Sequence, residues 1–164
     1  MKKELIVTIV VVILSVFELQ AQKGPLRGEG PILSKSFDFN DFDKIAFEDF
    51  DGKIEVEIGK PFSIKVAIDE NLAPRLQVEK EATEGLLRIY LRENKNGRLY
   101  LEDTHISIKV TLPEASVISH RGNTSVKVAG IVGRYFRFEN QGNGDVHLEG
   151  SIDQLDIKKV EMAV

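Results

Sequence analysis

Gly122-Asn-Thr-Ser-Val-Lys-Val-Ala-Gly130 and Gly142-Asn-Gly-Asp-Val-His-Leu-Glu-Gly150 are two versions of one nine-residue motif, separated by 20 residues. Each version begins with a glycine turn, continues into a short strand with alternating apolar residues, and closes on a second glycine. A unit this short cannot bury its own apolar face, so successive copies must stack on one another. The motif therefore predicts parallel coils of about 20 residues, with their apolar side chains inside.

Two pairs of apolar residues extend the repeat beyond the motif. Phe136 and Phe138 alternate with polar residues, and Leu155 and Ile157 do the same 19 residues later. We expect the later pair to cover the apolar face of the coil that contains the earlier pair. The segment 158–164 then has two interpretations, namely a cap on the last strand or the remnant of a longer array of repeats.

The glycines of the second motif carry a conformational prediction. A coil must change direction where one strand gives way to the next, and glycine reaches backbone conformations at such corners that other residues avoid. We therefore predict that Gly142 or Gly144 has a positive φ and that valine would be strained there.

Most of the chain after Phe37 alternates apolar and polar residues with a period of two, which is typical of half-buried strands. The alternating runs 54–58 and 62–68 flank a short Gly-Lys-Pro turn and are predicted to form a hairpin. The segment 69–76 contains a proline and is predicted as one helical turn capped by Asp69. The predicted fold class is all-β, a right-handed β-helix or solenoid-like stack of short strands.

The chain of 164 residues divides into three predicted parts. Residues 1–21 are predicted to be a secretory signal peptide, because two lysines precede the apolar run Leu5–Phe17 and Ala21 suits signal peptidase. The run is shorter than the roughly 20 residues that span a bilayer. Residues 22–36 are predicted as a flexible lead-in rich in glycine and proline, and residues 37–164 as one β domain.

Composition narrows the possible partners. The formal net charge is -4, and no basic cluster predicts binding to nucleic acid. Tryptophan is absent, which weakens the case for a platform that stacks on sugars. Cysteine is also absent, so packing and backbone pairing alone must hold the exported domain together, with no disulfide or lipid-modified cysteine.

Several segments of the chain, taken in their order along the sequence, resemble the "putative auto-transporter adhesin, head GIN domain" family of exported bacterial proteins. The resemblance covers roughly Phe37 to Ile157. It rests on the two glycine motifs and on four earlier segments: Phe42-Asp-Lys-Ile45, Ile54-Glu-Val-Glu-Ile58, Val66-Ala-Ile-Asp-Glu-Asn-Leu72 and Ile106-Ser-Ile-Lys-Val-Thr-Leu-Pro113. The resemblance implies a right-handed β-solenoid behind a signal peptide, and it transfers no catalytic residue.

Metal binding is a weak alternative at two places. The sequence from Gly142 to Asp145 is similar to a turn of a calcium-binding β-roll, but that roll repeats every nine residues and the equivalent of Asp145 is Ser125. The three histidines, His105, His120 and His147, lack the paired spacing of zinc ligands and are predicted at the surface. We therefore predict no metal, cofactor or catalytic residue.

A polysaccharide-acting enzyme on a β-helix scaffold is the alternative function. That chemistry requires two carboxyl groups that converge across a cleft, one of them with a raised pKa. The acids here, such as Glu55 and Glu57, mostly alternate with apolar residues, which is typical of the solvated face of a strand.

The sequence favours an exported, non-enzymatic β-solenoid domain that serves as an adhesin or as a binding or structural module of the cell envelope. Its expected location is the periplasm, the outer envelope or the extracellular space. The expected partner is an envelope protein or a glycan, and membrane contact is expected only through the signal peptide before cleavage.

Overall fold

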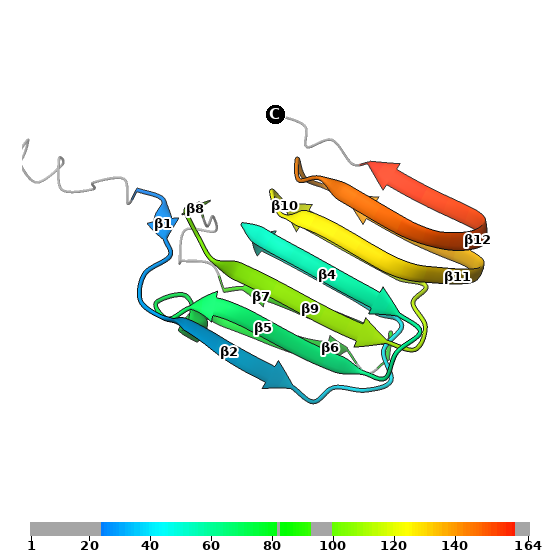
Figure 1. Ribbon diagram of the computed structural model, residues 1–164, viewed down its shortest axis with the longest axis horizontal. Coiled ribbons are helices and arrows are strands. Elements are labelled where there is room, and N and C mark those ends of the chain that lie inside the picture. Colours follow the sequence, from blue (N-terminus) through cyan, green and yellow to red (C-terminus); the bar gives the residue numbers. More distant parts are fainter. Residues whose placement is uncertain (1–23, 82, 93–99, 160–164) are drawn as a thin grey trace, which may run out of the picture.

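The computed structural model describes residues 24–81, 83–92 and 100–159 (Figure 1). These residues form strands almost throughout, with one short 3-10 helix. The elements are β1 (Leu26–Arg27), β2 (Ile32–Phe37), β3 (Lys44–Phe50), β4 (Gly52–Ile58), β5 (Ser63–Asp69), η1 (Ala73–Arg75), β6 (Leu76–Glu81), β7 (Leu86–Leu91), β8 (Leu101–Glu102), β9 (Ile106–Leu112), β10 (Val117–Gly122), β11 (Ser125–Asn140) and β12 (Val146–Lys159).

Ten of these strands form one mixed sheet that folds over on itself into a nearly closed, barrel-like shape. The order is β2-β5-β9-β4-β11-β10-β3-β7-β6, and β12 pairs with β11. The front layer contains β2, β5, β9 and β4, and the back layer contains β6, β7, β3 and β10 (Figure 1). The long strands β11 and β12 belong to both layers, because β11 pairs first with β4 and later with β10.

The 20-residue repeat of the sequence reappears as the register of parallel pairing. Val126 lies opposite Val146, and Ile118 lies opposite Phe138. The register shifts between Ala129 and Ile131, so the offset falls from 20 to 19 beyond the bend. This bulge explains the second offset in the sequence, because Phe136 and Phe138 pair with Leu155 and Ile157. The predicted pairing of these two apolar runs is confirmed.

The core lies between the two layers and comes from the inward residues of each strand. Val126 and Val128 contribute from the front layer, and Phe136 and Phe138 contribute from the back layer. All four side chains are buried, and each buried aromatic or branched side chain contributes about 1.5–3 kcal/mol relative to an exposed one. The apolar residues of β12 are more exposed, because this strand has a neighbour only on its β11 side among the described residues.

The all-β class is confirmed, but the described residues form a mixed, barrel-like sheet instead of the predicted right-handed β-helix or solenoid. Strands β7 and β9 pair in parallel with β3 and β4. Beyond them, β6 is antiparallel to β7, β5 is antiparallel to β9, and β2 is antiparallel to β5. The sheet is therefore mixed, with antiparallel strands at one end of the stack and parallel strands at the other.

The predicted hairpin of segments 54–58 and 62–68 is wrong. Both segments form strands, β4 and β5, but β9 lies between them and pairs with each. The alternation along β9 matches that of the two predicted partners, so a period-two pattern cannot choose among three equivalent strands. The short turn joins strands that are not neighbours.

Ordered structure also begins before the predicted domain start at Phe37. The stretch 22–36, expected as a flexible lead-in, contains β1 and most of β2 among its described residues. Strand β1 pairs with β8, and β2 pairs with β5. Residues 1–21, the predicted signal peptide, lie outside the described residues.

Asp69 has a different role from the predicted helix cap. The residue that caps η1 is Leu72, and no side chain bonds to the start of this helix. The carboxylate of Asp69 is buried and accepts a hydrogen bond from the backbone N–H of His105 at 2.7 Å. Its other oxygen lies 3.2 Å from Nδ1 of His105. Asp69 thereby ties the end of β5 to the segment that leads into β9.

Gly142 and Gly144 do not have positive φ, so the predicted conformation is wrong. The positive values fall in the first motif, at 142° for Gly122 and 79° for Gly130. The second motif needs glycine for a different reason, because its turn lies directly on the turn below. A Cβ atom on Gly142 would stand 1.7 Å from the carbonyl oxygen of Gly122, and one on Gly144 would stand 1.9 Å from that of Thr124.

Candidate functional site

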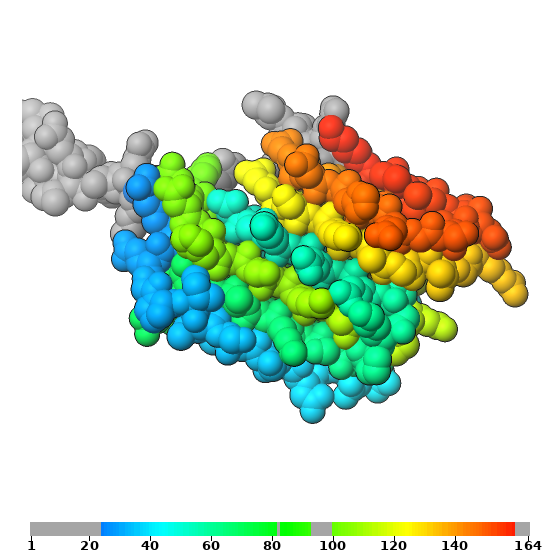
Figure 2. Space-filling model, viewed as in Figure 1, coloured from blue at the N-terminus to red at the C-terminus, as the bar shows by residue number. Residues whose placement is uncertain are grey.

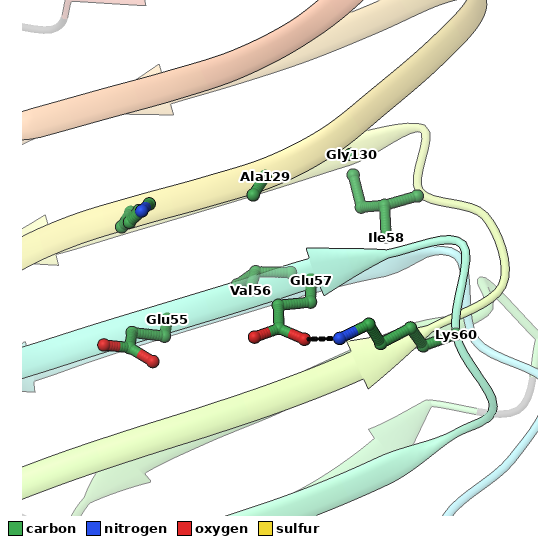
Figure 3. Close-up of a pocket in the computed structure, with 8 residues that line it drawn as sticks. Glu55, Val56, Glu57, Ile58, Lys60, Ala129 and Gly130 are labelled. Atoms are coloured by element: carbon green, nitrogen blue, oxygen red, sulfur yellow. Dashed lines mark hydrogen bonds and ion pairs between the residues drawn. The ribbon is translucent and has the colours of Figure 1, made fainter.

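A shallow groove of about 260 Å³ lies on the outer face of the front layer, between β4 and β11 (Figure 3). The outward residues of β4 line one side, and Lys127 and Ala129 of β11 line the other. Ala129 and Gly130 are too small to fill the space beside the long side chains of β4. Gly130 also stands close to the backbone of Ile58, where a Cβ atom would lie 2.4 Å from the carbonyl oxygen.

Glu57 is the most strongly perturbed acid of the groove. Lys109 on the neighbouring β9 donates a hydrogen bond to its carboxylate at 2.7 Å, and Lys60 forms an ion pair with it (Figure 3). The hydrogen bonds from Lys109 and Lys60 lower the pKa of Glu57 to about 2, and the bond from Lys109 has the larger effect. The same contact raises the pKa of Lys109. Glu57 is therefore ionised at any physiological pH and cannot serve as a general acid.

The remaining polar groups of the groove are exposed and spread along the strands. Glu55 lies two residues before Glu57 on the same face of β4, and its carboxylate is 4.0 Å from Lys109. Lys127 makes no ion pair with any residue that the structure describes. The groove thus presents two carboxylates on β4, one lysine just beyond the end of β4 and one on β11, an arrangement suited to complementary charges on a partner.

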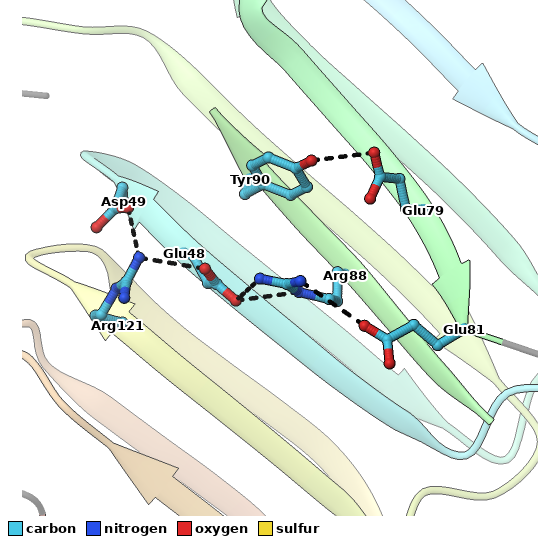
Figure 4. Close-up of polar contacts among 7 residues, drawn as sticks. All are labelled: Glu48, Asp49, Glu79, Glu81, Arg88, Tyr90 and Arg121. Carbon is cyan, nitrogen blue, oxygen red and sulfur yellow. Dashed lines mark hydrogen bonds and ion pairs between the residues drawn. The ribbon is translucent and has the colours of Figure 1, made fainter. Parts of the chain in front are cut away.

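A denser set of charges lies on the outer face of the back layer (Figure 4). Glu48 of β3 is its centre. Arg88 of β7 donates two hydrogen bonds to one oxygen of Glu48, at 2.9 and 3.3 Å, and Arg121 of β10 donates to the other at 3.2 Å. Arg121 also reaches Asp49 at 2.7 Å, and Arg88 lies 3.7 Å from Glu81.

The partners of Arg88 are internal, which gives this cluster a structural role. The contact with Glu48 raises the pKa of Arg88, whose guanidinium also lies 5.5 Å from the centre of the Tyr90 ring. The Tyr90 hydroxyl donates to Glu79 at 3.0 Å (Figure 4). The cluster crosses four neighbouring strands, so it ties the back layer together and leaves fewer charges for a ligand than the groove does.

The structure places the three histidines apart from one another. His147 is exposed on the outer side of β12, as predicted, and the side chain of His105 is also largely exposed. His120 is a correction to the prediction, because it is buried with 2% of its surface exposed. Its Nδ1 lies 3.0 Å from Oδ1 of Asn140, the residue 20 positions later, while Nε2 has no partner among the described residues.

Burial of His120 gives the fold a predicted pH dependence. Burial lowers the pKa of His120, although the contact with Asn140 opposes the shift. Since the unfolded chain binds the proton more readily, stability should fall as the pH drops below about 6.5, by at most about 2 kcal/mol at pH 5. Urea denaturation of the wild type and His120→Gln at pH 7.5 and 5.0 tests this.

The substitution His120→Gln should reduce the loss of stability between the two pH values, whereas His147→Gln should leave it unchanged because His147 is exposed. An equal loss in all three proteins would show that other groups control the acid sensitivity.

The segment 142–145, the weak alternative for calcium, brings no set of metal ligands together among the described residues. Asp145 is exposed, and its backbone carbonyl accepts a hydrogen bond from the N–H of Val126 at 2.8 Å. Within the part of the chain that the structure describes, no three His, Asp or Glu side chains gather where they could hold a metal ion. The described residues also contain no helix of the length and apolarity that a membrane span requires.

The sequence predicted that the acidic residues of the groove are solvated, but it did not predict the groove. Glu55 and Glu57 were predicted as solvated strand residues, and both do lie on the outer face of β4. The missed signal is the small pair Ala129-Gly130, which leaves a hollow only because β11 lies beside β4. That pairing joins residues about 70 positions apart, and no local pattern reports it.

Three solved structures share the fold over 82% of this chain. A "putative lipid binding protein" from Parabacteroides distasonis matches with a TM-score of 0.67 and 23% identity. A "putative adhesin" from Parabacteroides merdae matches with a TM-score of 0.67 and 18% identity, and one from Bacteroides fragilis with 0.65 and 18%. The chain spans 62%, 55% and 61% of these longer proteins, respectively.

No match is found among curated protein sequences. The family model described as "Putative auto-transporter adhesin, head GIN domain" matches residues 41–163, which include both glycine motifs and both layers of the sheet. The chain therefore belongs to the family described as "Putative auto-transporter adhesin, head GIN domain".

Proposed function

We propose that this protein is an exported, non-enzymatic binding module of the bacterial cell envelope, whose coils present the groove between β4 and β11 to a partner. The groove supports this proposal because its charged side chains point outward, and three of the four, Glu55, Glu57 and Lys127, lie on the paired strands β4 and β11. Membership in an adhesin family and the adhesin titles of two structural neighbours agree with export and surface binding.

The chemistry of the groove favours a protein partner over a glycan. Its lining contains carboxylates, lysines and small residues but no aromatic ring among the described residues, so these residues offer no stacking surface of the kind on which sugars commonly bind. The exposed carboxylates and lysines instead favour a partner with complementary charges, which gains specificity more than raw affinity from such contacts. A shallow surface of this kind fits a broad protein contact better than the enclosure of a small molecule.

A site-specific photo-crosslinker tests this function in the producing bacterium. Placed at Lys127 in the groove, it should capture an envelope protein, whereas the same group at the exposed Glu79 of β6 on the opposite face should not. Reversing the groove charge with Glu55→Lys should abolish the capture.

Two other outcomes would overturn parts of the proposal. Binding on a glycan array that Glu55→Lys removes, without any captured protein, would make a glycan the partner. Hydrolysis of a polysaccharide that Glu55→Gln abolishes would restore the alternative of an enzyme on a β-helix scaffold, with a carboxylate other than the ionised Glu57 as its acid.

Export is the part of the proposal that residues 1–21 carry, and it has its own prediction. The mature protein should begin at Gln22, because Ala21 ends the segment recognised by signal peptidase. N-terminal sequencing of protein from the envelope fraction checks this. Val11→Arg, which interrupts the apolar run, should leave the uncleaved chain in the cytoplasm. A mature chain that keeps Met1 and remains with the inner membrane would contradict the signal peptide.

A further inference from the structure

Strand β12 presents a longer edge without a described neighbour than the other two edge strands of the sheet, β2 and β6. Strand β12 is 14 residues long, and among the described residues it pairs only with β11. It forms the margin of the molecule opposite β2 (Figure 2). Unpaired N–H and C=O groups along an edge this long are a template for another strand. Strands β2 and β6 end the stack on the other side.

The inward side chains of β12 are also incompletely covered. Val146, Leu155 and Ile157 have 36%, 44% and 60% of their surfaces exposed, whereas their counterparts on β11 are buried. Leu148 packs against the core from the same strand. At the β12 end, no described element therefore covers the apolar interior between the two layers. A matching apolar surface would extend the core across this end.

We propose that a second copy of this chain covers the open end, with the two β12 strands antiparallel across a two-fold axis. Strand β12 bends from the front layer to the back layer near Gly150, as β11 does near Gly130. A two-fold axis beside this bend places the front half of one β12 over the back half of the other. The two layers then continue from one copy into the next.

The sequence of β12 is complementary to itself in one such register. When Val146 lies opposite Ile157 of the other copy, Leu148 lies opposite Leu155, so apolar residues meet apolar residues. Between and beyond them, His147 faces Asp156, and Asp145 faces Lys158. Both of these outward pairs bring a basic group to a carboxylate, and each pair occurs twice because of the two-fold symmetry.

The two neighbouring registers are disfavoured because they place carboxylates opposite each other. Inward side chains meet inward ones only when the strands slip by two positions in their pairing, because side chains alternate between faces. A slip in one direction places Glu149 opposite Asp156, and a slip in the other places Asp145 opposite Asp156. Each repulsion would occur twice, so the register with Asp145 opposite Lys158 is the favoured one.

Charge reversal and rescue test this register directly. Light scattering and sedimentation of the full chain should show two copies per particle, dissociating on dilution. Lys158→Glu should weaken the dimer at least tenfold, because it sets two carboxylates against each other. Adding Asp145→Lys should restore the dissociation constant to within about threefold. The control Lys65→Glu, the same charge change on the exposed face of β5, should have no effect.

Hydrogen exchange separates a second copy from a segment of the same chain. In the proposed dimer, amides of β12 become protected only as the protein concentration rises. Protection of β12 that does not depend on concentration would mean that the chain covers its own edge, and this would overturn the proposal. A monomer at 100 µM, an open-ended polymer, or a dimer indifferent to Lys158→Glu would overturn it equally.

Discussion

Gly142→Val should lower the free energy of unfolding by at least about 2 kcal/mol. A Cβ atom at this position would lie 1.7 Å from the carbonyl oxygen of Gly122 and 3.0 Å from its backbone nitrogen. Backbone atoms of a stacked turn cannot swing aside as the end of a flexible side chain can, so the two turns must separate. Urea denaturation followed by far-ultraviolet circular dichroism measures the loss.

Gly59 supplies the matched control, because its glycine is needed for a different reason. It has a φ of 88°, and a Cβ atom there would meet nothing within 4 Å. Asparagine tolerates this conformation, so Gly59→Asn should be nearly neutral, whereas Gly142→Asn should be as harmful as Gly142→Val. If both asparagine variants are neutral, the stacked turns are not held as closely as the structure shows.

Phe136→Ala should cost about 3–5 kcal/mol, the largest effect that we expect from a single truncated side chain. Phe136 is fully buried in the back half of β11, with Leu155 of β12 as its neighbour in the next strand. Removing the ring leaves a cavity at the end of the core where β12 provides the only cover among the described residues. Denaturant unfolding at a fixed protein concentration measures the cost.

Tyr135, the adjacent residue on the same strand, is the control for Phe136. Its side chain is outward and 41% exposed, and its hydroxyl lies 3.4 Å from the carboxylate of Asp156. Tyr135→Ala should therefore cost less than about 1 kcal/mol. Comparable losses at both positions would mean that β11 is held by backbone pairing rather than by the apolar interior.

The local sequence pattern predicted which segments form strands, but it did not predict which strands lie side by side. The alternation of Ile54, Val56 and Ile58 correctly marks β4, and that of Ile106 to Leu112 correctly marks β9. The same pattern could not show that β9 separates β4 from β5, because all three strands present equivalent apolar faces. Only the repeated motif contained pairing information, since its 20-residue spacing is itself the register of β11 with β12.

The predictions for the backbone angle of Gly142 and for the exposure of His120 are wrong, because both properties depend on residues of a neighbouring strand or turn. Gly142 needs no unusual backbone angle, but it has no room for a Cβ atom because the turn at Gly122 lies against it. His120 follows a serine on β10 and looks like a surface residue, yet β10 directs it between the layers beside Asn140. The groove of the candidate site likewise depends on Ala129 lying beside β4, a contact that the sequence does not report.

The two ends of the stack differ in how they can change during evolution. At the end that contains β2 and β6, each of these strands is antiparallel to its neighbour, so an added repeat unit would not continue a parallel register there. At the β12 end, duplication of one 20-residue unit would add a further parallel turn in the existing register and lengthen the molecule by about 4.8 Å. Such duplications would leave the groove between β4 and β11 unaltered, so the length of the domain can evolve independently of its binding face.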